Sequence, residues 1–297
     1  MLFVIDLLCF LVVPVFMWWA IRGAVPMAVL PILTGLCVAI AADRLGFDKS
    51  MLCPSDLGET LGWLGVLALA FSAGLETRVS SEGPKMSGQV VLAALVALAL
   101  PFAVGFGVAF SGVVDAVLLR PEGVSPLLSA GAIGLCLAVS ALPVLVGIVR
   151  ELPIADRPLG NLALRIAALD DAILWIGLAV LLFLHSGDGG VVLAGDWAKL
   201  GSFATFALMI LARGRIDRFI PNNIVITIAL GLGYLFAGAW ASDALGLHEL
   251  LGAYFAGALA PKVLAERLKP ELLGKIALFG LSPLFFAHRG LSIDGAV

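Results

Sequence analysis

The chain has 297 residues, of which 61% are hydrophobic and 13% are charged, and its mean hydropathy is +1.10. Soluble domains usually have about 45–50% apolar and about 25% charged residues, so the composition excludes an ordinary soluble protein and a soluble domain with a single anchor. The formal net charge of −3 and the lack of a basic tract give no indication of nucleic-acid binding. At about 20 residues a helix, the chain has room for roughly ten membrane spans.

Apolar windows bounded by charged residues, Gly and Pro predict ten transmembrane helices. The first has no basic residue before it, so we expect it to be retained rather than cleaved as a signal peptide, with Trp18 and Trp19 at a membrane interface. Residues 91–110 are apolar on every face except at their glycines, whereas a barrel strand would alternate, so the fold class is all-α and polytopic. The spans lie near residues 2–20, 24–42, 59–75, 87–111, 126–149, 159–184, 198–212, 220–240, 246–261 and 276–293.

Lys and Arg are distributed unequally between the connectors, and this predicts the orientation. The connectors after odd-numbered spans hold twelve of them and those after even-numbered spans hold four. Because cytoplasmic loops carry the excess of positive charge, we expect the N-terminus and the end of the tenth span outside, in the cell (inner) membrane. The twelve are Arg22, Arg78, Lys85, Arg150, Arg157, Arg213, Arg215, Arg218, Lys262, Arg267, Lys269 and Lys275; the four are Arg44, Lys49, Arg120 and Lys199.

The fifth span contains Ser140 and Pro143, which predict a kinked or broken helix. Proline removes a backbone donor and clashes with the preceding turn, and the serine hydroxyl can bond the freed carbonyls. Broken helices at the midplane present carbonyl oxygens and helix-end dipoles to ions in many secondary transporters. A plain proline kink is the alternative.

Asp170 and Asp171 lie near the middle of the sixth span, about 18 Å from either end of that helix. An ionised carboxylate at the bilayer centre costs at least about 2.5–3.5 kcal/mol, so we expect the pair to face a watery cavity or a partner. Adjacent side chains point about 100° apart, so one carboxylate could face the cavity and the other a neighbouring helix. Their mutual repulsion favours a proton on one of them, and proton binding can then compete with cation binding. The alternative is a hydrogen-bonded pair that only fixes helix packing.

Two arginines within apolar spans are candidate countercharges for Asp170. Arg165 precedes Asp171 by six residues, about 9 Å along the axis, and is also close enough to the cytoplasmic surface to extend there. Arg289 lies near the end of the last span, and the sequence does not choose between them. His248 and Glu249 open the ninth span, where we expect a role at the helix start.

Enzyme motifs and metal-ligand spacings are missing from the sequence. No G-x-S-x-G, H-E-x-x-H or P-loop pattern occurs, so we do not expect an enzyme. Cys9, Cys37 and Cys136 lie in apolar runs and Cys53 in a polar connector, so their spacing indicates neither a disulfide framework nor a metal site.

Several segments together resemble the monovalent cation/proton antiporter-2 family, and within it the subgroup related to fungal and plant cation/proton exchangers. The similarity covers essentially the whole chain. A serine-proline break followed by a central Asp pair in the next helix is a specific combination, whereas each motif alone is weak. The matching segments are Phe71-Ser-Ala-Gly-Leu-Glu76, Ala138-Val-Ser-Ala-Leu-Pro-Val-Leu145, Val149-Arg-Glu-Leu152, Gly160, Ala168-Leu-Asp-Asp171, Leu247-His-Glu-Leu-Leu-Gly-Ala-Tyr-Phe-Ala-Gly257 with Pro261, and Pro283-Leu-Phe-Phe-Ala-His-Arg-Gly-Leu291.

The resemblance implies a thirteen-helix antiporter of two inverted repeats, with residues 1–297 as one transmembrane domain. The first repeat would cover about 1–184, and an incomplete second repeat about 198–297. A core domain would move as an elevator against a dimerisation domain, which implies a homodimer that exchanges Na⁺ or K⁺ for H⁺ without a cofactor. By the family pattern Asp171 would bind the proton and the cation in turn beside Asp170, with no other metal, and the backbone around Ser140 would cross a second broken helix.

The chain departs from the family pattern in two places. Pro31 stands where the family usually has a glutamate before the glycine of span two, here Gly35. The family also continues beyond the tenth span with a cationic residue, a second broken helix and a final span. We therefore expect the sequence to be a fragment, and a shortened homologue that uses Arg165 or Arg289 as the countercharge is the alternative.

The leading hypothesis is a secondary antiporter that exchanges Na⁺ or K⁺ for protons by alternating access, with Asp170 and Asp171 as its site. A gated cation-efflux channel and a transport-inactive scaffold or partner subunit are the alternatives. An organic-anion symporter is disfavoured, because the Asp pair would repel an anion unless bound cations screened it.

Overall fold

The computed structural model describes nine segments of the chain, and all the regular structure within them is helical, as the sequence predicts. The segments are residues 7–21, 25–46, 55–79, 88–112, 125–139, 142–153, 156–186, 197–245 and 248–292. The helices are η1 (Leu7–Val12), α2 (Val13–Ala20), α3 (Leu30–Leu45), α4 (Asp56–Val79), α5 (Gly88–Ser111), α7 (Pro126–Ala138), α8 (Leu142–Glu151), α9 (Arg157–Ser186), α10 (Trp197–Ala212), η4 (Asp217–Phe219), α11 (Ile224–Ala244), α12 (Glu249–Leu259), α13 (Lys262–Arg267), α14 (Pro270–Ile276), η5 (Ala277–Leu281) and α15 (Ser282–Leu291).

Each of the ten predicted spans overlaps at least one of these helices. Within the described residues, four helices are long and apolar enough to cross a membrane by themselves, namely Asp56–Glu76, Gly88–Ser111, Ile224–Ala244 and Pro270–Leu291. Five other predicted spans correspond to shorter apolar helices, and the sixth corresponds to α9. The hydropathy pattern therefore located the helices, although several are shorter than the windows that predicted them.

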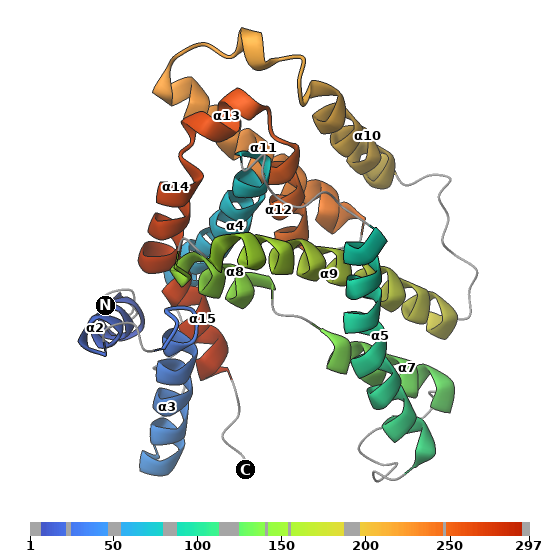
Figure 1. The fold of residues 1–297 in the computed structure, drawn as a ribbon. Coiled ribbons are helices and arrows are strands. Elements are labelled where there is room, and N and C mark those ends of the chain that lie inside the picture. The colour runs from blue at the N-terminus through green and yellow to red at the C-terminus, as the bar shows by residue number, and fades with distance from the viewer. Residues whose placement is uncertain are drawn as a thin grey trace.

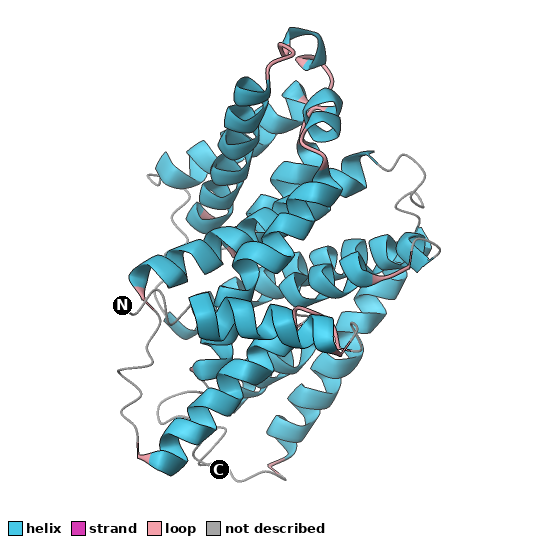
Figure 2. Cartoon of the chain, turned by 90° about the vertical axis from the view of Figure 1, so that its left-hand side faces the viewer, coloured by secondary structure: helices cyan, strands magenta, loops and turns pink. Residues whose placement is uncertain are grey.

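The helices form two groups that meet through α8 and through a smaller contact between α9 and α12 (Figure 1). In the larger group, which we call the scaffold group, α4 packs against α12, α14 and α15, α11 packs against α12, and α3 packs against α15. The smaller group, which we call the α9 group, consists of α5, α7 and α9. Helix α8 contacts both α9 and α4, and Figure 2 shows the same helices from the side.

Glycines allow the scaffold helices to approach closely. A Cβ on Gly74 of α4 would overlap the carbonyl oxygen of Tyr254 on α12, and a Cβ on Gly257 would overlap the carbonyl oxygen of Phe71. The α3–α15 contact is built the same way, because a Cβ on Gly290 would overlap the carbonyl oxygen of Ile32. Such backbone contact is the usual device by which small residues bring membrane helices together.

The two tryptophans of the first span have different surroundings. Trp19 is 71% exposed, in keeping with a place at the membrane interface. Trp18 is turned inward instead: its ring packs edge-on against Phe279 with the centroids 5.0 Å apart, and its indole Nε1 donates to Glu151 at 3.1 Å. An indole N–H away from water needs an acceptor, and the carboxylate that ends α8 provides one.

Candidate functional site

Asp170 lies near the middle of α9 and is 7% exposed. Its Oδ1 atom is buried and has no hydrogen-bond partner within the described part of the chain. The backbone of Asp171 belongs to the same helix, but its side chain lies outside what the structure describes. A buried carboxylate oxygen without a partner is costly when it is charged, so Asp170 is suited to taking up a proton or a cation.

The helix that carries Ser140 and Pro143 in the sequence is interrupted in the structure. Helix α7 ends at Ala138, Val139 is extended with φ −58° and ψ 127°, and α8 begins at Leu142. Ser140 lies outside the described residues, and so does the side chain of Pro143, whose backbone is in the first turn of α8. At that position the missing N–H costs no intrahelical bond.

The interrupted helix lies against the carboxylate helix, because α7 and α8 both pack on α9. Two helix ends flank the interruption. The last turn of α7 and the first turn of α8 each leave backbone groups without intrahelical partners, carbonyls on one side and N–H groups on the other. Helix α7 itself starts at a regular cap, where Ser125 Oγ accepts from the Leu128 N–H at 3.3 Å and Pro126 occupies the first turn.

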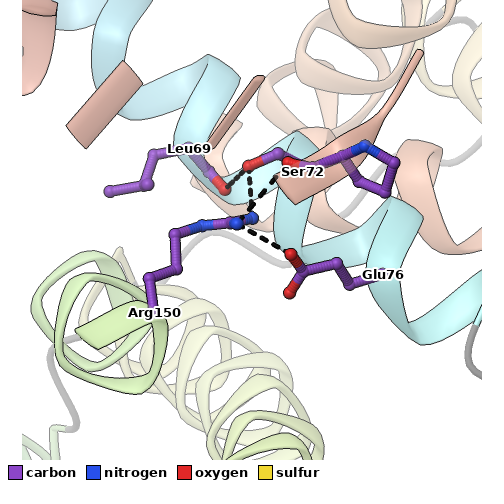
Figure 3. Close-up of polar contacts among 5 residues, drawn as sticks. Leu69, Ser72, Glu76 and Arg150 are labelled. Carbon is purple, nitrogen blue, oxygen red and sulfur yellow. Dashed lines mark hydrogen bonds and ion pairs between the residues drawn. The ribbon is translucent and has the colours of Figure 1, made fainter. Parts of the chain in front are cut away.

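The last turn of α8 is joined to the scaffold group through Arg150 (Figure 3). Its Nη1 donates to Glu76 Oε1 at 2.7 Å and its Nη2 donates to Ser72 Oγ at 2.7 Å, both on α4. The Ser72 hydroxyl in turn donates to the Leu69 carbonyl at 2.7 Å. The Arg150 side chain is 6% exposed, and a Cβ on Gly274 of α14 would overlap its guanidinium. We call Ser72, Glu76 and Arg150 the α4–α8 network.

The next residue, Glu151, is bonded to α2 and to the turn that precedes α3. Its Oε2 accepts from Trp18 Nε1 at 3.1 Å, and its Oε1 accepts from the Met27 N–H. Burial raises the pKa of Glu151, and the two hydrogen bonds oppose that rise because they favour the charged form. The end of α8 is thus held by two adjacent charged residues, Arg150 bonded to α4 and Glu151 bonded to α2 and to the turn before α3.

Neither the count of Arg150 as a connector charge nor the motifs that contain Arg150 and Glu76 predicted their ion pair. The two residues are separated by 74 positions in the chain. One signal was available: each is a charged residue at the end of an apolar helix, with opposite sign and on the same predicted side of the membrane. Nothing in the spacing indicated that Gly274 makes room for the guanidinium.

A cavity of about 240 Å³ opens beside the α4–α8 network. The positive-inside count predicts that this end of the helices is cytoplasmic. Asn161, on the first part of α9, brings the carboxylate helix to the cavity wall. The polar residues that line this cavity are Glu76, Arg150, Asn161, Glu271 and Lys275.

The two candidate countercharges are placed differently. Arg165 is on α9 and partly exposed, five residues before Asp170, a spacing that turns the two side chains to different faces of the helix. Arg289 lies near the end of α15, with its guanidinium 5.0 Å from the centroid of the Phe285 ring. It lines a cavity of about 470 Å³ together with Asp56 and Glu59, on the scaffold group.

His248 and metal-ligand clusters complete the inventory of sequence candidates. His248 caps α12, since its Nδ1 accepts from the Leu250 N–H at 3.2 Å, as expected for a residue at a helix start. In the described segments no group of three or more His, Cys, Asp or Glu side chains could hold a metal ion. Cys9, Cys37 and Cys136 are free thiols.

Comparison with known proteins adds to this geometry. The family profile described as "Sodium/hydrogen exchanger, transmembrane" matches residues 7–297. Cation/H(+) antiporter 19 of Arabidopsis thaliana is 31% identical over 261 residues, 84% of this chain and 31% of that protein. The Na(+)/H(+) antiporter NhaS4 of Synechocystis is 27% identical over 245 residues, 79% of this chain and 58% of that protein. The K(+)/H(+) antiporter 1 of Saccharomyces cerevisiae is 26% identical over 247 residues, 78% of this chain and 28% of that protein. The chain therefore spans less than two thirds of the length of each of these relatives.

Proposed function

The chain belongs to the sodium/hydrogen exchanger family, a family of integral membrane transporters, and we propose that it exchanges a monovalent cation for protons across the membrane. The observation that carries the proposal is the buried Asp170 Oδ1 without a hydrogen-bond partner in the described structure, in the middle of a helix that packs against an interrupted one. Relatives named as Na⁺/H⁺ and as K⁺/H⁺ antiporters make Na⁺ and K⁺ the candidate cations.

Competition for one carboxylate is sufficient to couple the two ions. A charged carboxylate at the bilayer centre costs at least about 2.5–3.5 kcal/mol, and either a bound proton or a bound cation removes that cost. The site then crosses the membrane loaded with one or the other, which is exchange. By the family resemblance we assign the alternating role to Asp171 and the neighbouring role to Asp170.

The helix interruption supports the cation-bound state. The carbonyl end of α7 carries partial negative charge and favours a cation, and the amide end of α8 favours an anionic carboxylate. We assign the residues between the two helix ends, Ser140 included, and Pro143 to this part of the site. An inverted-repeat architecture in which a second broken helix crosses there belongs to the same proposal.

The division into two helix groups supports an elevator movement. The α9 group would move with the site while the glycine-packed scaffold group stays in place and forms the dimer contact. Helix α8 reaches α4 through Arg150, so that contact would have to change in each cycle. Arg165 and Arg289 remain the candidate countercharges for Asp170. They are proposed from the sequence and not from a contact with Asp170.

Transport by the purified full chain in proteoliposomes tests the proposal. We expect Na⁺ or K⁺ to dissipate an imposed ΔpH, measured as dequenching of a pH-sensitive dye, and Asp170→Asn and Asp171→Asn each to reduce the rate at least tenfold. Asp243→Asn, which alters an exposed carboxylate at the end of α11, is the matched control. Wild-type exchange in both aspartate variants would refute the assignment.

Two other outcomes would favour the alternatives. Cation currents that follow voltage and move no protons would indicate a gated efflux channel. A scaffold or partner subunit would be indicated if the wild type assembled correctly but showed no exchange. In that case, changing both aspartates to alanine should leave assembly unaffected.

A further inference from the structure

An apolar groove of about 430 Å³ runs along the scaffold group between α4, α11 and α14. Its floor is Ala68 and Phe71 of α4, and Phe71 belongs to the buried core with 2% exposure. Its walls are open to the surroundings, since Ile228 is 48% and Leu272 is 53% exposed. The groove therefore leads from the outer surface of the helices down to the core.

One end of this groove is positively charged. Arg267, at the end of α13, and Lys269, just before α14, are the charged residues of its lining. Arg267 is held in place, because its Nη1 donates to the carbonyls of Ile220 at 3.2 Å and Pro221 at 2.7 Å.

Lys269 has an unusual backbone. It is the one non-glycine residue with positive φ in the described segments, at φ 48° and ψ 70°. A left-handed conformation is costly for a residue with a Cβ atom, which comes close to the following carbonyl oxygen, and it persists where the surroundings require it. Here it places a lysine, where glycine or asparagine would be less strained, at the mouth of an apolar groove.

We propose that this groove binds one anionic phospholipid, with an acyl chain along α4, α11 and α14 and the phosphate group at Lys269 and Arg267. From Ile224 to Leu235 the wall of α11 is about 16 Å long, which suits most of an acyl chain. Basic pockets between transmembrane helices on the cytoplasmic side bind anionic head groups. The positive-inside count predicts that the segment with Arg267 and Lys269 lies on that side, where anionic lipids are enriched.

Charge complementarity favours a lipid over a second copy of the chain. A second copy would bring the same two cations to the same place if the contact were symmetric, because an isologous interface repeats one patch on both subunits. A lipid supplies both the apolar chain and the negative charge. The inference depends on the fold and on the rim charges, and it is independent of the proposed transport activity.

Two pairs of variants test the site in the full chain. Lys269→Asn removes the charge and keeps a residue that tolerates positive φ, and Lys262→Gln is its control, because Lys262 is 52% exposed and pairs with Glu266 away from the groove. Gly231→Leu fills the groove, since Gly231 lines it and the atoms nearest to a Cβ there belong to the flexible Leu268 side chain. Gly233→Leu, two residues along the same helix, is its control, because a Cβ at Gly233 meets nothing within 4 Å.

Delipidated protein is titrated with phosphatidylglycerol or phosphatidylcholine, and bound lipid is counted by native mass spectrometry alongside thermal unfolding. We expect the wild type and both controls to bind phosphatidylglycerol more tightly than phosphatidylcholine. Lys269→Asn should weaken phosphatidylglycerol binding about fivefold, and Gly231→Leu should remove the bound lipid. The proposal would be overturned if the two lipids bound equally well, or if Lys262→Gln and Lys269→Asn lost the same amount of binding. It would also be overturned if glycerol phosphate alone stabilised the protein, or if Gly231→Leu dissociated a dimer without loss of lipid.

Discussion

Replacing Glu76 with leucine tests the α4–α8 network. The Arg150 guanidinium would lose its 2.7 Å ion pair, although its side chain is buried, with 6% exposure in the intact structure. Breaking a buried pair from one side costs about 3–5 kcal/mol, because the remaining charge is left uncompensated. Glu76 is 23% exposed and borders a cavity, so water screens part of the pair and the expected cost is near 3 kcal/mol.

The double variant Glu76→Leu/Arg150→Met separates a charge effect from a loss of packing. Removing both charges also removes the uncompensated guanidinium, so the double variant should be more stable than Glu76→Leu alone. Unfolding by sodium dodecyl sulfate in mixed micelles, followed by tryptophan fluorescence, measures both free energies on the full chain. A cost below about 1 kcal/mol for Glu76→Leu, or additive costs for the two single changes, would show that the pair does not form.

Gly274→Ala tests the same geometry from α14. A methyl group at Gly274 would overlap the Arg150 guanidinium, and overpacking of this kind costs about 1–3 kcal/mol. The cost should shrink when Arg150 is already methionine, whose unbranched side chain can move aside. Gly280→Ala is the control, because a Cβ there meets nothing within 4 Å. Equal effects of the two alanines would contradict the placement of Arg150.

Three further predictions concern other parts of the molecule. Because the pKa of Glu151 is raised, the folded chain holds this proton more tightly than the unfolded chain does. The free energy of unfolding should therefore fall as the pH rises from the ordinary pKa of 4.5 towards the raised pKa of the folded chain. Glu151→Gln should flatten that slope in unfolding curves measured at several pH values. Gly74→Leu should prevent assembly, since its side chain would meet the Tyr254 backbone, whereas Gly107→Leu should leave the size-exclusion profile unchanged. Asn223→Ala should cost about 1 kcal/mol in the same unfolding assay, because Asn223 Oδ1 caps α11 by accepting from the Val225 N–H at 2.8 Å.

Local sequence patterns predicted much of the fold because they depend on few residues at a time. The apolar windows located the helices, and proline with its neighbours located the interruption between α7 and α8. The sequence also singled out Asp170, because a charged residue within an apolar window can be recognised without knowing which residues it contacts. Its role in transport stays a prediction, as do the roles of Asp171, Ser140, Pro143 and the two arginines.

Contacts between distant segments could not be predicted in the same way. Trp18 looked like an interfacial tryptophan because its neighbours are apolar, yet a carboxylate 133 positions away accepts its N–H. Arg150 and Glu76 each looked like a charge at a helix end until the crossing of α8 and α4 brought them together. No window contains both members of either pair, so no periodicity could reveal them.

By itself, the sequence determined that this chain is a helical membrane protein of the exchanger family, because hydropathy and motif spacing are properties of neighbouring residues and do not depend on contacts with distant segments. Only the tertiary structure decided which helices form the scaffold, that the end of α8 binds α4 through Arg150, and that a groove with a cationic end lies beside α11. These features depend on the angles and distances at which helices cross. Glycines allow these close crossings, and the residues that they contact come from distant parts of the chain. The contact between Gly74 and Gly257 is the clearest case.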